Sequence, residues 1–247
     1  VMTATPIPRT LGLTLYGDLD CSVIDELPAG RGKINTYVRT PNSRDKIIAF
    51  LKEQVSSGRQ AYVIFPRVEN EDPNIGIKAV KAESKRLGKE FHTHKVGILH
   101  GRLKPDEKAQ VMAEFRENRI QVLLSTTVVE VGVDVPNANL MLIENADQFG
   151  LAQLHQLRGR IGRGEHESYC ILLTTDKSNH PNERLKVLEE TNDGFKVAEA
   201  DLQLRGPGEL TGHDQSGLPN FLFGDLRSDL DLIQLARNLA REIEAGS

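Results

Sequence analysis

Two arginines, each preceded by a glycine, are the first residues in this sequence whose type and spacing indicate chemistry. Arg160 and Arg163 lie three residues apart in the run 156–164, and this spacing places two guanidinium groups on nearly one side of the chain. A guanidinium is a planar fork of N–H donors that matches phosphate oxygens, and such arginines stabilise a phosphoryl group during its transfer. A solvated basic loop has the same composition, so the pairs alone leave both interpretations open.

A second candidate phosphate site follows directly after an apolar run, in residues 125–136. Hydroxyl groups and free backbone N–H groups at a strand end are good phosphate contacts, and Thr126 offers one of them. Gly132 allows close approach of the backbone, and Asp134 is suited to orient a ribose, a water or an arginine. The alternative is an edge strand that ends in a turn, because Thr and Val favour strands.

Weaker signals stand beside these two. His100-Gly101-Arg102 lies between a predicted strand and a predicted helix, where backbone amides can face a phosphate; a structural histidine is the alternative. We interpret His92 and His94 as surface histidines rather than metal ligands. One predicted helix is basic, which we interpret as a solvated face with DNA contact as the alternative; its basic residues are Lys78, Lys81, Lys85, Arg86 and Lys89.

The elements that must position these residues alternate along the chain. Short, wholly apolar strands separated by helices predict an α/β fold, with a parallel sheet covered by helices on both faces. The predicted strands are 34–38, 61–65, 96–99, 122–125, 140–143 and 169–173, and the predicted helices are 43–55, 77–91, 105–115 and 151–157. Residues 68–75 are expected to form a solvated connector.

The pattern changes after Thr175, where the strands stop. Helices are expected at 182–191 and 195–204, forming a hairpin whose first helix is stopped by Asn192-Asp193-Gly194. A Gly- and Pro-containing loop is expected at 205–224. Ser228 then caps a final helix with one apolar stripe, made of Leu232, Leu235, Leu239 and Ile243.

Composition restricts the class of protein. The 247 residues carry a formal net charge of −4, which gives no support for a nucleic-acid partner but does not exclude a local basic surface. No apolar run is long enough to span a membrane. The two cysteines are far apart, which argues against a disulfide framework and against zinc and indicates a cytoplasmic protein. The chain opens inside an apolar element, at Val1, so we expect a piece of a longer protein.

Four motifs together resemble those of superfamily-2 helicases, in the order and spacing of that family. The region after them is similar to the translocation motif that the RecG and Mfd families share, and residues 16–28 and 162–165 favour RecG. The helicase motifs are Thr3-Ala4-Thr5, His100-Gly101, Thr126 to Asp134 and Gln156 to Arg163. The translocation motif comprises Glu183-Arg184-Leu185, Asn192 to Phe195, Ala198 to Leu202, Leu204 to Leu210 and Gln215 to Gly217.

The resemblance implies a RecA-like fold and a role for each motif. Residues 1–33 would be the end of a first RecA-like domain with a linker, 34–175 the second RecA-like domain, and 176–247 the translocation hairpin, loop and last helix. Arg160, Arg163 and Gln156 would act on ATP, with Gly132 and Asp134 completing the nucleotide side. Gly101 and Thr126 would hold DNA. The residues expected to couple ATP to movement are Thr3, Thr5, Arg184, Arg205 and Gln215.

The resemblance further implies an ATP-dependent DNA helicase that uses Mg²⁺ and acts on branched DNA in repair and recombination. Its first RecA-like domain, which supplies the phosphate loop and the Mg²⁺ carboxylates, and its DNA-reading wedge domain are expected outside this chain. We expect a monomer with no membrane association and no metal site in the chain itself. The alternatives are the same half of an Mfd-like translocase and a non-catalytic RecA-like protein-binding module.

The 247-residue chain alone is therefore expected not to hydrolyse ATP at a helicase rate. Without the phosphate loop and the Mg²⁺ carboxylates, the phosphates are not positioned and their charge is not neutralised. Phosphate release from the purified chain, with and without DNA, is the measurement. A turnover of ~1 per second, the low end for enzymes of ordinary speed, would contradict this expectation.

Overall fold

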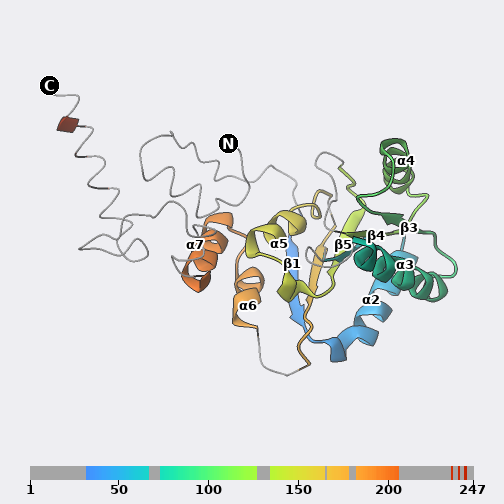
Figure 1. Cartoon of the computed structure of the whole chain (residues 1–247), viewed down its shortest axis with the longest axis horizontal. Helices are drawn as coiled ribbons and strands as arrows, with labels where there is room; N and C mark the ends of the chain where they lie inside the picture. Colours follow the sequence, from blue (N-terminus) through green and yellow to red (C-terminus); the bar gives the residue numbers. More distant parts are fainter. Residues whose placement is uncertain are drawn as a thin grey trace. The chain divides into compact units, whose positions relative to one another are not determined.

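The computed structural model describes residues 32–66, 73–126, 134–164, 166–177 and 182–205, together with 235, 239, 242 and 243 (Figure 1). Two compact units divide the chain: Leu27–Glu190 forms one, and Val1–Glu26 with Thr191–Ser247 forms the other. The boundary predicted after Thr175 differs from this division, because the unit that holds the sheet also includes the helix that follows residue 182. The predicted domain boundary stays a prediction.

A single parallel sheet of six strands, in the order β1-β6-β5-β2-β4-β3, organises the larger unit. The strands are β1 (Ile34–Arg39), β2 (Gln60–Phe65), β3 (Val96–Leu99), β4 (Val122–Thr126), β5 (Ala138–Ile143) and β6 (Ser168–Leu173). Strands β2, β4 and β5 lie in the middle of the sheet and are almost wholly buried, which is why their sequences are continuous apolar runs. The predicted α/β fold with a parallel sheet is confirmed.

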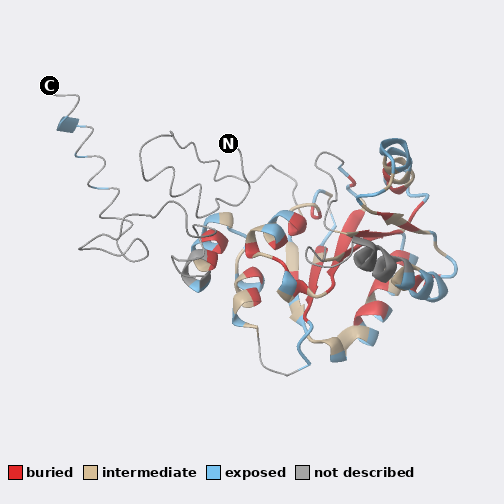
Figure 2. Ribbon diagram, viewed as in Figure 1, coloured by how far each residue is buried: buried red, intermediate tan, exposed pale blue. Residues whose placement is uncertain are grey.

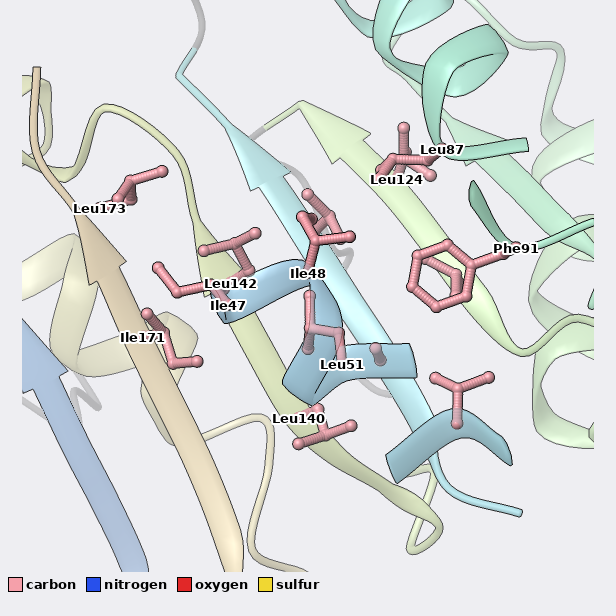
Figure 3. Close-up of a cluster of buried hydrophobic side chains, with 14 residues drawn as sticks. Ile47, Ile48, Leu51, Leu87, Phe91, Leu124, Leu140, Leu142, Ile171 and Leu173 are labelled. Atoms are coloured by element: carbon pink, nitrogen blue, oxygen red, sulfur yellow. The ribbon is translucent and has the colours of Figure 1, made fainter. Parts of the chain in front are cut away.

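Helices connect the strands and cover both faces of the sheet. On one face, side chains of α2 and α3 pack against alternate residues of β2, β4, β5 and β6 (Figure 3). On the other face Tyr62 of β2 contacts Phe115 of α4, with ring centroids 4.9 Å apart. The helices are α2 (Arg44–Ser56), α3 (Pro73–Glu90), α4 (Pro105–Arg116), α5 (Leu151–Arg158), α6 (Glu183–Glu190) and α7 (Gly194–Arg205).

Helix α3 begins earlier than its sequence predicts. It starts at Pro73, whereas the apolar spacing indicates a start at Ile77. Proline is tolerated at the first position of a helix, because the N–H that it lacks has no partner there. Of the predicted connector 68–75, the last three residues are thus helical, and residues 67–72 lie outside the described part of the chain.

Helix α6 covers the outer edge of β1, the first edge strand of the sheet. The backbone N–H of Val38 donates to Oε1 of Glu189 at 2.6 Å, and Nη1 of Arg39 lies 3.5 Å from the same oxygen. An open strand edge is a site for unwanted pairing with another chain. In this chain the carboxylate of Glu189, in α6, lies against the open edge of β1.

Helix α7 and the last helical residues belong to the smaller unit. Asp193 begins α7, because its Oδ1 accepts from the N–H of Phe195 at 2.8 Å and its carbonyl accepts from that of Val197 at 3.1 Å. The segment predicted to stop one helix therefore also caps the next. Of the predicted C-terminal stripe, residues Leu235, Leu239 and Ile243 are helical and exposed; Ser228 and Leu232 lie outside the described residues.

Buried residues are concentrated along the sheet and on the sheet-facing sides of the helices (Figure 2). In the part of the chain that the structure describes, no helix combines the length and the apolar character that crossing a membrane requires.

Replacement of Leu142 by alanine tests this core directly. Leu142 is fully buried in β5, so Leu142→Ala should lower the free energy of unfolding by about 2–5 kcal/mol, through lost burial and the cavity left behind. Urea unfolding of the chain provides the measurement. The matched control is Lys85→Ala on the exposed side of α3, for which a change within about 0.5 kcal/mol is expected; similar losses in both variants would contradict the placement of the core.

Candidate functional site

The two Gly-Arg pairs lie at the edge of the sheet where the strands begin. Gly162 has a left-handed φ of 77°, and a Cβ there would lie 2.7 Å from Cγ1 of Ile34, at the start of β1. A Cβ on Gly164 would lie 2.7 Å from the carbonyl oxygen of Pro136, just before β5. The glycines therefore let the arginine segment pass between the starts of two strands, a position that any larger side chain would block.

Arg163 and Asp134 meet at this edge. Nη1 of Arg163 lies 3.7 Å from Oδ1 of Asp134, and the two side chains are 35% and 55% exposed. An exposed pair at this distance contributes little to stability. The guanidinium is therefore held loosely by a carboxylate and remains accessible to a phosphate.

Tyr62 lies beside the same group, although sequence reasoning assigned it no role. It is the third residue of β2, is 1% exposed, and packs against Phe115 of α4. Burial raises the pKa of the phenol to about 12; the charges of Arg163 and Arg160 act to lower this pKa, and that of Asp134 acts to raise it. All three predicted charges therefore lie close enough to affect one buried hydroxyl group, which supports their being a single cluster. A lone phenol inside an otherwise apolar strand was the only signal in the sequence.

The other predicted nucleotide residues are placed less completely. Gln156 is exposed on α5, one turn before Arg160. Gly132 lies outside the described residues. Of the residues predicted to act on a nucleotide, the structure therefore brings three together, with Tyr62 next to them: Arg160, Arg163 and Asp134.

The predicted DNA residues lie at the opposite edge, where the strands end. Thr126 is the last residue of β4 and pairs with Phe65 at the end of β2. Leu99 of β3 pairs with Ser125, so His100 and Gly101 follow beside Thr126. Gly101 is exposed, and a Cβ on it would meet nothing within 4 Å, so there is open space beside it.

Two arginines bond α6 to α5 and to the turn before α5. Arg158, a buried residue of α5, donates from Nη1 to the carbonyl oxygen of Leu188 in α6 at 2.7 Å. Arg184 donates from Nη2 to the carbonyl oxygen of Asp147 at 2.7 Å. Arg158 lies within the arginine motif, but its sequence position indicates no role; Arg184 is predicted to couple the hairpin to the motor, and this role stays a prediction. Near Arg158, burial raises the pKa of Cys170 to about 12, so its thiol is a core residue.

The remaining predicted coupling residues are not described with their side chains. Thr3, Thr5 and Gln215 lie outside the described residues, and Arg205 ends α7 without a described side chain. In the described ranges no cluster of three or more His, Cys, Asp and Glu is arranged to hold a metal ion. The two guanidinium groups of Arg160 and Arg163 have the chemistry to bind the phosphates of a nucleotide.

Two family models match the chain. Residues 43–165 match the family described as "Helicase conserved C-terminal domain", and residues 191–245 match "ATP-dependent DNA helicase RecG, domain 3, C-terminal". The second match begins one residue after the larger compact unit ends.

Similar proteins extend over nearly the whole chain. The ATP-dependent DNA helicase RecG of Synechocystis sp. is 54% identical over 240 residues, covering 97% of this chain and 29% of that protein. That of Bacillus subtilis is 50% identical over 245 residues, covering 99% and 36%. A solved structure of RecG bound to a three-way DNA junction has a TM-score of 0.71 at 46% identity, covering 95% of this chain and 30% of that one.

The parallel α/β fold and the helicase-domain match place the chain among the superfamily-2 helicases. The C-terminal match and the relatives narrow this class further. The chain belongs to the RecG-like helicases, and it spans about a third of the length of these relatives.

Alkaline unfolding tests the burial of Tyr62 beneath the arginines. A phenol pKa near 12 in the folded chain and ~10 in the unfolded chain means that the unfolded state loses its proton first. The contribution of the buried phenol to the free energy of unfolding is therefore fully present below pH ~10. It falls by about 2 kcal/mol as the pH rises toward 12. Urea unfolding of the wild type and of Tyr62→Phe should show this loss only in the wild type.

Tyr37, an exposed residue of β1, provides the control, because Tyr37→Phe should keep the alkaline loss of the wild type. Identical slopes for the wild type and Tyr62→Phe would mean that the hydroxyl of Tyr62 is not buried in the folded chain.

Proposed function

We propose that this chain is the second motor half of an ATP-dependent DNA helicase that acts on branched DNA in repair and recombination, including fork regression and Holliday-junction processing. The observation that carries the proposal is the separation of two sites by one parallel sheet, with guanidinium groups at one edge and an open strand-end surface at the other. The relative bound to a three-way DNA junction supports the choice of branched DNA. In this proposal, a first motor domain of a longer protein holds the phosphate loop and Mg²⁺.

Arg160 and Arg163 have the arrangement that ATP hydrolysis across a domain interface requires. ATP, when bound, would supply a γ-phosphoryl group for transfer, and negative charge would develop on the leaving phosphate beside the charge spread over the γ-phosphoryl oxygens. The two guanidinium groups are placed to stabilise that charge. Asp134 holds Arg163 at 3.7 Å, and exchange of this carboxylate for phosphate oxygens leaves the arginine in an ion pair throughout.

The opposite edge is suited to the DNA backbone. Thr126 offers a hydroxyl group, and Gly101 is an exposed glycine with open space beside it, where the DNA backbone can come close. Contacts of this kind go to phosphates and position a protein on DNA without reading its sequence. A motor that moves along any sequence needs that type of contact.

Coupling between the two edges is assigned to the helical hairpin. Arg184 bonds α6 to the turn before α5, and Arg158 bonds α5 itself to α6. The first hairpin helix is therefore bonded once to α5 and once to the turn that leads into it. We propose that Thr3, Thr5, Arg205 and Gln215 complete this coupling in the full-length protein.

Two alternatives are less well supported. An Mfd-like translocase would share the hairpin, but the C-terminal family match and the relatives carry the name RecG. A non-catalytic binding module has no need for an exposed Arg163 beside a half-buried Arg160 where the strands begin, which disfavours that class.

The arginine assignment is tested in the full-length protein by Arg163→Ala. Turnover of ATP should fall about a thousandfold, the low end of the effect of an arginine finger, while ATP affinity stays near that of the wild type, because the charge develops mainly in the transition state. Nucleotide binding, steady-state hydrolysis and unwinding of a three-way junction should be measured side by side.

The matched control is Arg119→Ala, which removes an exposed guanidinium paired with Glu117 and should leave all three measurements unchanged. An unchanged rate in Arg163→Ala would make the Gly-Arg segment a solvated loop. A wild type that hydrolyses ATP but unwinds no branched DNA would contradict the proposed substrate.

A further inference from the structure

A buried ion-pair cluster lies at the strand-end edge, outside the residues assigned above. Nη1 of Arg44 donates to both carboxylate oxygens of Glu144, at 2.6 and 2.7 Å. Nη2 of the same guanidinium donates to Oε1 of Glu83 at 2.5 Å. Arg44 begins α2, Glu83 belongs to α3, and Glu144 directly follows β5. One guanidinium therefore joins two helices and a strand end.

Formation of this cluster requires the desolvation of charged groups, which is favourable only when the ion pairs are well aligned. The side chain of Glu144 is 6% exposed, that of Glu83 is 17% exposed and that of Arg44 is 24% exposed. Burial raises the pKa of Glu144 above its ordinary value, although the bonds from Arg44 act to lower it. Buried charges of this kind are weak evidence for added stability, because their desolvation offsets much of their attraction. They hold their partners in one arrangement, however, since removal of Arg44 would leave the buried carboxylate of Glu144 without this guanidinium, whereas Glu83 would keep its pair with Arg86.

Glu144 also lies beside the predicted DNA edge. Its backbone N–H donates to the carbonyl oxygen of Ile64 at 2.8 Å, next to Phe65, which pairs with Thr126. The cluster is therefore separated from Thr126 by the end of a single strand.

The turn that begins at Glu144 is followed by α5 and then by the candidate nucleotide arginines. Residues 144–148, which we call the β5 turn, precede α5. Within this turn Asp147 accepts from the N–H of Thr175 at 2.7 Å and from Arg184 through its carbonyl oxygen. The β5 turn is thus bonded at one end to Arg44 of α2, which in turn bonds Glu83 of α3. At its other end it is bonded to Thr175, just after β6, and to Arg184 of α6, and α5 carries the chain from the turn to Arg160.

We propose that Arg44 is a positioning residue through which DNA bound at the strand-end edge sets the position of α5 and of the arginines that follow it. The inference rests on the proposed function and adds a residue to it. Because a single rigid fork holds both α3 and the β5 turn, a displacement of one is passed to the other. A lysine in place of Arg44 would hold only one carboxylate at a time.

The structure supplies a matched control in a second ion pair between the same two helices. Lys52 of α2 is paired with Glu90, the last residue of α3, about two helical turns along each helix from Arg44 and Glu83. Loss of the Lys52 pair weakens the packing of α2 on α3 without touching the proposed connection.

The test compares ATP hydrolysis by the full-length wild type, Arg44→Met, Glu144→Gln and Lys52→Met over a range of three-way junction concentrations. In Arg44→Met and Glu144→Gln, the DNA-stimulated kcat should fall about tenfold, a typical site-to-site coupling, with the KM for ATP unchanged. The rate without DNA should stay within about twofold, as for changes away from a reacting group. Lys52→Met should behave as the wild type, and Arg44→Met with Glu144→Gln should be no worse than either change alone.

Glu144→Gln decides the question if Arg44→Met fails to fold by circular dichroism, because it leaves no unpaired buried carboxylate at position 144 and keeps the bond from Arg44 to Glu83. Unchanged stimulation in Glu144→Gln, an equal loss in Lys52→Met, or a parallel fall of the rates with and without DNA would each overturn the inference. A wild type without DNA stimulation would contradict the proposed function itself.

Discussion

The single direction of the six strands is the constraint on which the rest of this structure depends. Because every strand is parallel to its neighbours, all residues that precede a strand lie at one edge of the sheet and all residues that follow one lie at the other. Asp134 precedes β5 and Arg163 precedes β6, whereas Thr126 ends β4 and Gly101 follows β3. Strand direction alone therefore separates the candidate nucleotide residues from the candidate DNA residues by the length of a strand, roughly 17–20 Å.

Charge and burial differ between the two edges in a way that suits this division. At the strand-start edge the Arg163–Asp134 pair is partly exposed, so its guanidinium can change partners at small cost. At the strand-end edge Arg44 and Glu144 are largely buried, so their partners are fixed. The exposed Arg163–Asp134 pair is suited to ligand binding, because Arg163 can exchange Asp134 for a ligand. The Arg44–Glu144 pair is suited to holding the β5 turn in one position.

The sequence predicts the fold well because the central strands are buried on both faces. Continuous apolar runs such as 122–125 and 140–143 are typical of strands in a parallel sheet that helices cover on each side. Each predicted strand is present, with its ends shifted by two residues at most. The start of α3 was missed because a proline looks like an interruption, although it suits the first turn of a helix.

The site was predictable only where residues are close in sequence. Arg160 and Arg163 form a recognisable motif, but Tyr62 lies far from them in the chain and resembles any other core residue of its strand. The bond from Arg44 to Glu144 joins positions 100 residues apart, and no local pattern indicates it. Only the topology of the sheet brings such residues together.

Hydrogen–deuterium exchange on the full-length protein tests the separation of the two edges most directly. A non-hydrolysable ATP analogue should slow exchange in residues 159–164, and a three-way DNA junction without nucleotide should slow exchange in residues 99–102. Protection of the same segment by both ligands, or of 99–102 by the nucleotide alone, would contradict the account.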